Sequence, residues 1–458
     1  MLHKIPTGIL LLAAVVFSAE GKSLYVAMEG SDAFPGTFLQ PVATVTRASA
    51  LAAPGDTIWI RRGGYHVSEQ MVIQARGKPG QWIVFMPYPG EKVAFNVDKI
   101  PWPEPREKQK FPHTTGALQI ENAAWVKVCD IGIRYSHRAG IIVRNSQHIE
   151  LIRCVVDNSY NSAIGIWYSD SVKVLSCDVS QANDQGKRMP FDRLGREAPH
   201  EAISLAGARY FEVAYNHVYH CFKEGIDCKE VSAHGIIHHN HIHDNSRQGI
   251  YVDAWFGTLH DVEVCDNVIY RCEYGIAVSV ECDTSRMENI RIHHNLVYLN
   301  RGSGIILGVW GKNNPRKEIY IYNNTVYGNG SPSHWSGATG GIDIRSSNIS
   351  EVYIVNNIVV NNYAYDIAAF ADPAVALKEL GERNVVVDHN LISKNTSLLF
   401  EKGDFGPVYA FPGTDAIVAD PLFEDEQQGD FRLRSGSPAR GKAKSLQSFK
   451  TGENLGAL

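Results

Sequence analysis

The sequence predicts an all-β protein folded as a right-handed parallel β-helix, a solenoid with an N-terminal capping helix. The first observation is a short phrase, Asn then any residue then Val or Ile, that returns once per predicted coil. Its steps of 24, 27, 28, 29, 33 and 33 residues are typical of similar coils that stack and share one core. The phrase begins at Asn216, Asn240, Asn267, Asn295, Asn324, Asn357 and Asn390.

Short strands between these phrases give the second observation. In 290–292 and 319–322 every second residue is apolar, and Gly or Asn turns separate such segments. Parallel strands joined by crossovers form a right-handed coil. Leucine-rich repeats share the period, but the sequence lacks their Leu framework.

The Asn phrase has a structural explanation. Asn tolerates the left-handed turn conformation, and its amide can stack along the column of coils. Cys129, Cys154 and Cys177 take the same place in the first three coils, 25 and 23 residues apart. Because this spacing follows the coil, we expect buried free thiols in preference to disulfides, and no metal cluster in a chain without a CxxC pair.

The two ends of the chain show different signals. Residues 1–21 combine Lys4, an apolar run at 9–17 and small residues at 19 and 21, which predicts a secretory signal peptide and a secreted or periplasmic protein. The segment 43–53 should form a short amphipathic helix that covers the open end of the stack. We expect one domain over 22–458, with an N-terminal cap and first coils at 22–115, regular coils at 116–400 and a C-terminal cap at 401–458.

Composition narrows the range of partners. The net charge of −5 and the pI near 6.4 argue against nucleic acid as a general partner. After the predicted leader, no segment reaches the length of a membrane span. We expect the mature chain to act as a monomer.

Four strands carry the candidate chemistry. Aligning residues 202–203, 225–226, 249–250 and 275–276 places an Ile of each strand in the core, so alternation turns the next residue outward. The first predicted outer column is Ser204, Asp227, Tyr251 and Ala277. The second is Ala206, Lys229, Asp253 and Ser279, and the third, ahead of the Gly, is Glu201, Glu224, Gln248 and Tyr274.

Carboxylates therefore gather on one outer face. Neighbouring coils lie about 4.8 Å apart, so Glu201 should lie beside Glu224, Lys229 should lie beside Asp253, and Glu281 should extend the patch by one coil. Like charges directly opposite each other destabilise a strand pair. The glutamate pair breaks this rule, which predicts a bound cation or a raised pKa.

Each of these residues also has a plainer explanation. Lys229 and Asp253 could form only a surface ion pair, and either glutamate alone could be a solvated turn residue. Tyr251 and Trp255 could simply shield the coil, although exposed aromatic rings also stack against sugars.

Histidines are frequent near the Asn phrase. Those at 234, 238, 239, 241, 243, 293 and 294 resemble metal ligands by residue type. Most of them flank the phrase on the side of the coil opposite the carboxylates, and they show no closed set of three or four. We therefore do not expect them to bind a metal.

One interval between coils is unusually long. Residues 181–200 form a polar excursion that contains Arg188, Arg193 and Arg196 and ends at His200. Loops of this length inside a compact array are usually functional, although a solvated loop without a function explains the length equally well. We expect these four side chains, together with Trp255, to bind substrate.

Two segments of the candidate strands resemble known enzymes. Glu224-Gly225-Ile226-Asp227-Cys228-Lys229-Glu230, followed by Gly249-Ile250-Tyr251-Val252-Asp253, is similar to the catalytic strands of the mannuronan C5-epimerases, which carry Tyr-Gly-Phe-Asp-Pro-His-Glu and then a Gly strand ending in Asp. On that resemblance, Asp227 and Asp253 match catalytic aspartates, Lys229 replaces a His and Glu224 replaces a Tyr.

The same strand is also similar to β-helical alginate lyases. In those enzymes a calcium-binding Glu precedes the catalytic Lys by five positions, the interval between Glu224 and Lys229, and Glu201 stands for their other calcium-binding acid. The opening at 25–67 and the ending at 419–439 likewise resemble secreted bacterial β-helix proteins of the pectate-lyase-like superfamily.

The lead hypothesis is a carbohydrate-active enzyme, a polysaccharide lyase that acts on a uronate-containing glycan. Ca²⁺ held by Glu201, Glu224 and Asp227 would bind the uronate carboxylate, Lys229 would remove the C5 proton, and Tyr251 or a water would protonate the leaving oxygen. The loop arginines could grip neighbouring carboxylates.

Two alternatives stay open. A glycoside hydrolase could use two of Asp227, Asp253, Glu281 and Glu201, because side chains on adjacent coils suit the separation of about 5 to 5.5 Å in retaining enzymes. A non-catalytic glycan-binding surface protein could use the carboxylates only to bind calcium.

Overall fold

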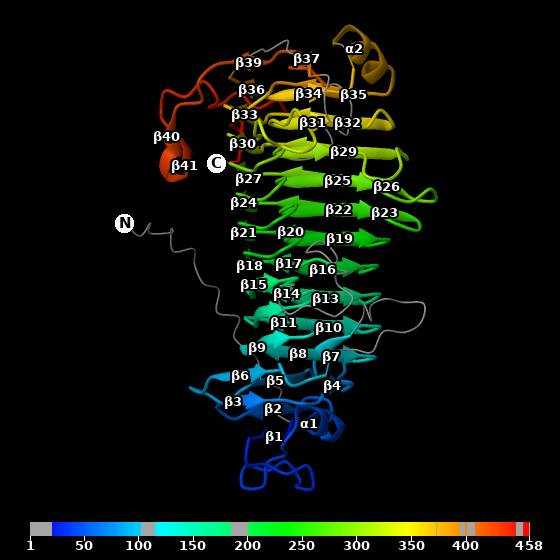
Figure 1. Cartoon of the computed structure of the whole chain (residues 1–458), viewed down its shortest axis with the longest axis vertical. Helices are drawn as coiled ribbons and strands as arrows, with labels where there is room; N and C mark the ends of the chain where they lie inside the picture. The colour runs from blue at the N-terminus through cyan, green and yellow to red at the C-terminus, as the bar shows by residue number, and fades with distance from the viewer. Residues whose placement is uncertain are drawn as a thin grey trace.

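The computed structural model describes residues 21–101, 115–184, 200–371, 373–393, 399–400, 408–445 and 452–457. Within them the chain is a stack of coils, each built from up to three short strands that belong to three long sheets. The sheets run along the whole body, with β1 and α1 at one end and α2 at the other (Figure 1). The predicted all-β solenoid is confirmed.

The first sheet has 13 parallel strands. In stacking order they are β1 (Ser23–Val26), β2 (Thr57–Ile60), β5 (Ile83–Pro87), β8 (Ala124–Cys129), β11 (Gln147–Ile152), β14 (Asp170–Leu175), β17 (Glu212–Ala214), β20 (Ala233–His238), β23 (Thr258–Cys265), β26 (Arg286–His293), β29 (Arg316–Tyr322), β32 (Ile349–Val355) and β35 (Val385–Asp388).

The second sheet carries the strands singled out in the sequence. It contains β4 (Met71–Ile73), β7 (Gly116–Glu121), β10 (Ala139–Arg144), β13 (Ile164–Trp167), β16 (Ile203–Ala206), β19 (Ile226–Glu230), β22 (Ile250–Ala254), β25 (Ile276–Val280), β28 (Ile305–Leu307), β31 (Ile342–Ile344), β34 (Ile367–Ala369), β38 (Val408–Ala410) and β37 (Leu399–Phe400). Its last two strands pair antiparallel.

The third sheet contains β3 (Gly63–His66), β6 (Val93–Asn96), β9 (Ile131–Ser136), β12 (Val155–Ser159), β15 (Asp178–Ala182), β18 (His217–Tyr219), β21 (His241–His243), β24 (Val268–Tyr270), β27 (Leu296–Tyr298), β30 (Thr325–Tyr327), β33 (Ile358–Val360), β36 (Leu391–Ile392) and β39 (Ile417–Val418). A separate antiparallel hairpin, β40 (Phe423–Asp425) and β41 (Asp430–Leu433), packs its phenylalanines against Tyr298 and Tyr327 of this sheet. The 3-10 turn Glu426–Gln428 joins the two hairpin strands.

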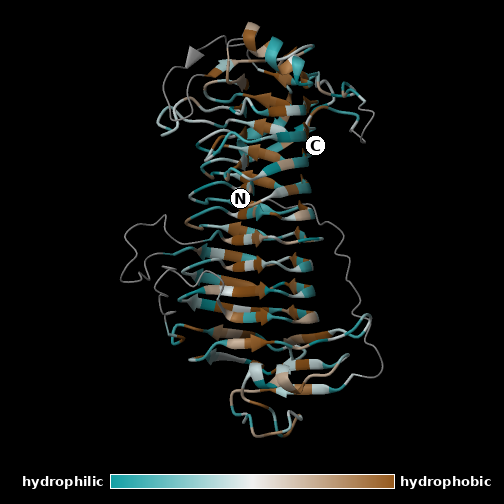
Figure 2. Ribbon diagram, turned by 90° about the vertical axis from the view of Figure 1, so that its right-hand side faces the viewer, coloured by the Kyte–Doolittle hydropathy of each residue, from teal (hydrophilic) through white to brown (hydrophobic). Residues whose placement is uncertain are grey.

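Alternation along each strand fills a continuous interior. One coil contributes Val213, Val218 and Ile226 from the three sheets, and all three side chains are fully buried. The strands are coloured mainly as hydrophobic and the turns mainly as hydrophilic along the length of the body (Figure 2). Each buried Val or Ile contributes about 1.5–3 kcal/mol, so repetition of one pattern stabilises the whole stack.

The predicted Asn column is present. Asn240 donates from Nδ2 to Oδ1 of Asn267 at 2.9 Å, and the same contact repeats from coil to coil between Asn216 and Asn390. The left-handed residue is not the Asn itself, as the sequence suggested, but its predecessor, as in His239 with φ 53° and Asp266 with φ 55°. A second column five residues further on, including Asn300 and Asn329, was missed.

The cysteines follow the prediction. All eight lie in described residues and are free, seven of them buried and Cys282 partly exposed. The backbone N of Cys177 donates to Oδ1 of Asn216 at 2.8 Å, so this cysteine does hold the Asn position of its coil.

Two helices interrupt the strands. The expected capping helix is α1 (Val45–Leu51). Thr44 caps its N-terminus, and the Thr44 side chain accepts a hydrogen bond from the backbone N of Arg47. The second helix, α2 (Pro373–Glu382), was not predicted and accounts for the long step between Asn357 and Asn390. Among the described residues, neither helix has the length and apolar character needed to cross a bilayer. The predicted signal peptide lies outside the described residues except for Gly21.

Candidate functional site

The four candidate strands align as the sequence predicted. Ile226 pairs with Ile203 on one side and Ile250 on the other, and all are fully buried in the interior. The outer columns then read Ser204, Asp227, Tyr251 and Ala277, and Ala206, Lys229, Asp253 and Ser279. Backbone hydrogen bonds Ala202 N to Glu224 O and Gly225 N to Gln248 O confirm the third column.

The outer face of these strands is buried, although the sequence predicted an exposed surface. Asp227 is 2%, Asp253 4% and Lys229 8% exposed. Tyr251 and Tyr274 pack with Ala277, Ile306 and Trp310 in an apolar cluster next to the carboxylates. Because low dielectric strengthens electrostatic interactions, these charges act on one another more strongly than surface charges would.

Lys229 lies at the centre of the site. Its Nζ is 2.5 Å from Oε2 of Glu201, 3.6 Å from Oδ2 of Asp227 and 3.4 Å from Nδ1 of His200. Burial alone would lower the pKa of Lys229, but Glu201, Asp227 and Asp253 together raise it above its usual range. The alternative of a surface pair between Lys229 and Asp253 is wrong, because both residues are buried and Glu201 is the ion-pair partner.

Glu201 and Glu224 do lie on adjacent coils. Lys223 approaches Oε1 of Glu201 at 3.2 Å, and Arg247 approaches Oε1 of Glu224 at 3.0 Å. Burial would raise the pKa of Glu201, but Lys229 and Lys223 hold it well below its usual range. The predicted raised pKa is therefore wrong for Glu201, because these lysines supply the counter-charge.

Lys223 and Arg247 were missed by sequence reasoning. Both stand one residue before the third predicted column, in a column that also contains His200 and Glu273. Extending the alignment one residue toward the N-terminus would have found them, since the turn keeps the register of the strands.

Asp227 and Asp253 form the uncompensated part of the site. Burial, then the charge of Asp253, raise the pKa of Asp227 well above its usual range, and burial with Glu281 does the same to Asp253. Oδ1 of each aspartate is buried without a hydrogen-bond partner, as is Oε2 of Glu224. Trp255 donates its indole N–H to Oδ2 of Asp253 at 2.8 Å, so this ring positions a carboxylate.

Tyr251 and Glu281 close the far side of the site. The Tyr251 hydroxyl donates to Oε1 of Glu281. Burial and the charges of Asp253 and Glu281 raise the pKa of Tyr251 well above its usual range, so the phenol holds its proton at neutral pH. Burial also raises the pKa of Glu281.

The predicted substrate-binding loop is only partly described. Arg188, Arg193 and Arg196 lie outside the described residues. His200 packs edge-on against Trp167, with ring centroids 4.5 Å apart. Two exposed aromatic rings that the sequence analysis did not select, Phe222 and Phe256, directly neighbour Lys223 and Trp255 in the chain.

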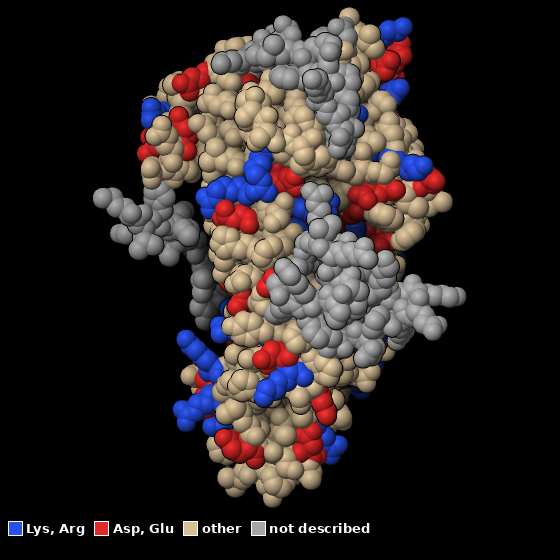
Figure 3. Space-filling view, in the orientation of Figure 1, with Lys and Arg blue, Asp and Glu red and all other residues tan. Residues whose placement is uncertain are grey.

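The acidic cluster, defined as Glu201, Glu224, Asp227, Asp253 and Glu281, is not electrically balanced by the described residues around it. Its charge partners there are Lys223, Lys229 and Arg247, so full ionisation would leave an excess of two negative charges. On the visible face of the molecule, acidic and basic side chains are interspersed (Figure 3).

The chemistry of the donors fits a hard divalent cation, which prefers carboxylate oxygens. The arrangement differs from the predicted calcium set of Glu201, Glu224 and Asp227. Both oxygens of Glu201 face lysines. Among the described residues, neither this trio nor the set of Glu224, Asp227 and Asp253 has ligand atoms that all lie within 4.8 Å of one another. Oxygens without a hydrogen-bond partner belong to Glu224, Asp227 and Asp253, and the one on Glu224 lies 3.9 Å from Nζ of Lys223.

One group of histidines does lie close enough together to bind a metal ion, contrary to the prediction from the sequence. His241 and His243 join His217 in a set whose ligand atoms lie within 4.8 Å of one another. The prediction that the histidines form no closed set is therefore wrong.

Sequence comparisons place this geometry in a known group of proteins. Residues 24–198 match the profile described as "Pel9A-like, right handed beta helix region", residues 116–283 match "Right handed beta helix region", and residues 287–411 match "Disaggregatase related". The chain is a right-handed β-helix protein, and its N-terminal part is similar to the Pel9A-like pectate lyases. The predicted handedness and the predicted resemblance to the pectate-lyase-like superfamily are thus confirmed.

Individual relatives of this β-helix protein are distant. The uncharacterized protein YwoF of Bacillus subtilis (strain 168) is 26% identical over 456 residues, covering 92% of each chain. Pectate lyase PEL9 of Emericella nidulans is 24% identical over 201 residues, which is 43% of this chain and 49% of that protein. The crystal structure of pectate lyase Pel9A covers 95% of this chain and 96% of its own, with 12% identity and a TM-score of 0.54, a likeness of fold.

Proposed function

We propose that this β-helix protein is a secreted or periplasmic polysaccharide lyase that cleaves a uronate-containing glycan by β-elimination. The observation that carries the proposal is Lys229, a buried lysine on the outer face of β19, set among carboxylates that exceed the neighbouring cations by two charges. Similarity to pectate lyases supports the choice of reaction. The predicted leader supports export.

β-Elimination needs a base beside the sugar proton and a group that neutralises the uronate carboxylate. Lys229 supplies the base, and its hydrogen bond to Glu201 fixes the direction of Nζ. Asp227 and Asp253, which each keep one oxygen without a hydrogen-bond partner, would supply ligands for Ca²⁺. The ion, when bound, supplies a positive charge that neutralises the uronate and acidifies its C5 proton.

The protonation of Lys229 sets a condition on this mechanism. The surrounding carboxylates raise the pKa of Lys229, so they hold its proton in the free protein. Lys229 acts as a base only when the charges of Asp227 and Asp253 are compensated, because those charges favour the ammonium form. Tyr251, which keeps its proton and is paired in register with Asp227, would protonate the leaving oxygen.

Substrate binding rests on two kinds of contact. The rings of Phe222 and Phe256 are exposed and neighbour Lys223 and Trp255 in the chain, and such rings suit stacking against sugar faces. Arg247, half-buried and paired with Glu224, offers a guanidinium for a neighbouring uronate.

The test is a panel of uronic and neutral polysaccharides, followed by ultraviolet absorbance of unsaturated ends and by a reducing-sugar assay. A lyase yields both signals on uronic polysaccharides, and chelation by EDTA abolishes them. Lys229→Ala should lower the rate of elimination by about 10²–10⁴-fold, the contribution of a positioned base. Lys317→Ala, at a partly exposed lysine of β29, should leave the rate unchanged.

A second candidate, glycoside hydrolysis, is favoured by one specific observation. Asp227 and Asp253 are neighbouring carboxyls with raised pKa values, so one can hold a proton while the other is charged, as acid and base roles require. Reducing ends without ultraviolet absorbance, lost in Asp253→Asn, would establish the hydrolase. Glycan binding without any product would establish a binding protein, and elimination that survives Lys229→Ala in folded protein would refute the lyase mechanism.

A further inference from the structure

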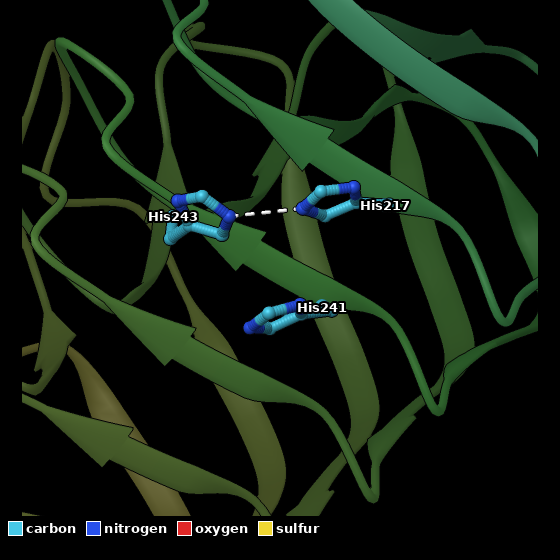
Figure 4. A group of neighbouring side chains, drawn as sticks. All are labelled: His217, His241 and His243. Atoms are coloured by element: carbon cyan, nitrogen blue, oxygen red, sulfur yellow. Dashed lines mark hydrogen bonds between the residues drawn. The ribbon is translucent and has the colours of Figure 1, made fainter. Parts of the chain in front are cut away.

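A cluster of three histidines lies on the outer face of the third sheet, away from the acidic cluster on the second. His217 comes from β18, and His241 and His243 come from β21 on the next coil. His217 pairs in register with His241, and alternation puts His243 on the same face two residues later. Figure 4 shows His217 and His243 pointing toward one another, with His241 beside both.

The hydrogen bonds of two rings leave lone pairs facing each other. Nδ1 of His217 lies 3.1 Å from Oδ2 of Asp178, and Nδ1 of His243 lies 2.6 Å from Oδ2 of Asp244. An ionised carboxylate only accepts hydrogen bonds, so each Nδ1 carries a proton and each neutral ring has its lone pair on Nε2. These two Nε2 atoms are 2.9 Å apart, a separation explained either by a proton shared between the two rings or by a metal ion bound to both.

The same contacts fix the orientation of the rings. Tyr219 stacks on His217, with centroids 4.2 Å apart, and Tyr270 stacks on His243 at 4.9 Å. Arg271 in turn holds Asp244 through two contacts of 2.6 and 2.7 Å. A carboxylate behind a ligating imidazole sets the tautomer and increases its basicity, the arrangement found behind zinc-binding histidines.

We infer that His217, His241 and His243 form a binding site for a divalent transition-metal ion of the zinc class. Three imidazole nitrogens suit Zn²⁺, whose tetrahedral coordination then keeps a fourth position for water. The ion would join two adjacent coils from outside, at a place separate from the carboxylates of the proposed active site. The inference does not depend on the proposed function, because it rests on different residues and a different ligand chemistry.

The test is calorimetric titration of the full-length, tag-free protein with ZnCl₂ after removal of metals by EDTA and dialysis. We expect one saturable equivalent of Zn²⁺. His241→Asn, a change at an exposed ring, should weaken this binding at least about 100-fold, and Asp244→Asn should weaken it about 10–100-fold, the usual effect of losing the group behind a ligand. Circular dichroism melting confirms that each variant is folded.

The matched control is His239→Asn, an exposed histidine of the same coil outside the trio, which should bind Zn²⁺ as the parent does. Excess CaCl₂ should leave the isotherm unchanged, since Ca²⁺ prefers oxygen ligands. The assignment is overturned if no saturable binding occurs, if His241→Asn binds with unchanged affinity, or if Ca²⁺ displaces the zinc.

Discussion

Lys229→Met tests the charge balance of the acidic cluster most directly. The change keeps most of the side-chain length but removes the cation that lies 2.5 Å from Glu201 and 3.6 Å from Asp227. Removing one partner of a buried ion pair costs about 3–5 kcal/mol, because the other charge stays buried. Lys223, 3.2 Å from Glu201, keeps part of the compensation, so we expect a loss near the lower end, about 3 kcal/mol.

This loss converts into a melting temperature. An unfolding entropy of about 2.1 cal/mol/K per residue over 458 residues gives about 1 kcal/mol per degree, so Lys229→Met should melt about 3 °C below the parent. Scanning calorimetry in EDTA at neutral pH measures the shift, and Lys317→Met, at a partly exposed lysine, serves as the matched control. In the double variant Lys229→Met/Glu201→Gln the loss should be smaller than the sum of the two single losses, since the pair is removed together. A Lys229→Met protein that melts at the parent temperature would refute the charge balance.

Three further predictions concern the acidic cluster and the Asn column. Asp227→Asn should gain stability relative to the parent as the pH rises above about 4 in EDTA. A carboxyl whose pKa is raised in the folded state stabilises the fold below its unfolded pKa and loses that contribution as the pH rises through its folded pKa. Equal melting curves from pH 4 to 8 would contradict this. Ca²⁺ at about 10 mM should stabilise the parent by about 1.4–2.7 kcal/mol for a Kd of about 10⁻³–10⁻⁴ M. The melting temperature should then rise by about 1.5–3 °C in the parent and stay unchanged in Asp227→Asn. A parent melting temperature insensitive to Ca²⁺ would refute the proposed calcium site. Asn267→Ala removes four buried hydrogen bonds with Ile237, Asn240 and Asn295, at about 1 kcal/mol each, and should melt about 4 °C lower; a shift below 1 °C would show that the Asn column is dispensable.

The strand register of the site could be read from the sequence because it depends only on short-range alternation. Ile203, Ile226 and Ile250 point into the core, and the strand geometry then fixes which side of the sheet Asp227 and Lys229 occupy. The same reasoning could not give their burial. Burial depends on what packs against the outer face, such as Trp310, which lies in the connection that follows β28.

The histidine cluster shows a different limit. The phrases at 217–219 and 241–243 differ at one outward position, where Tyr219 pairs with His243, so alternation alone places all three histidines on one face. Counted as a row along the chain, the histidines show no such set, and His217 does not stand out among them. A metal-site search in a solenoid has to run across coils, because residues about 24 apart in sequence are neighbours in space.

Like charges do gather on these strands, but the pair without counter-charge is not the one that the sequence indicates. Glu201 and Glu224 lie close together, and Lys223, Lys229 and Arg247 compensate their charges. The uncompensated pair is Asp227 and Asp253, which lie diagonally on adjacent coils and both have raised pKa values. Each of these carboxyls also keeps one buried oxygen without a partner, so the unpaired hydrogen-bonding capacity and the excess charge coincide. A proton, a cation or a substrate group can satisfy both at once, and the pKa of Lys229 then responds to whatever binds between the two aspartates.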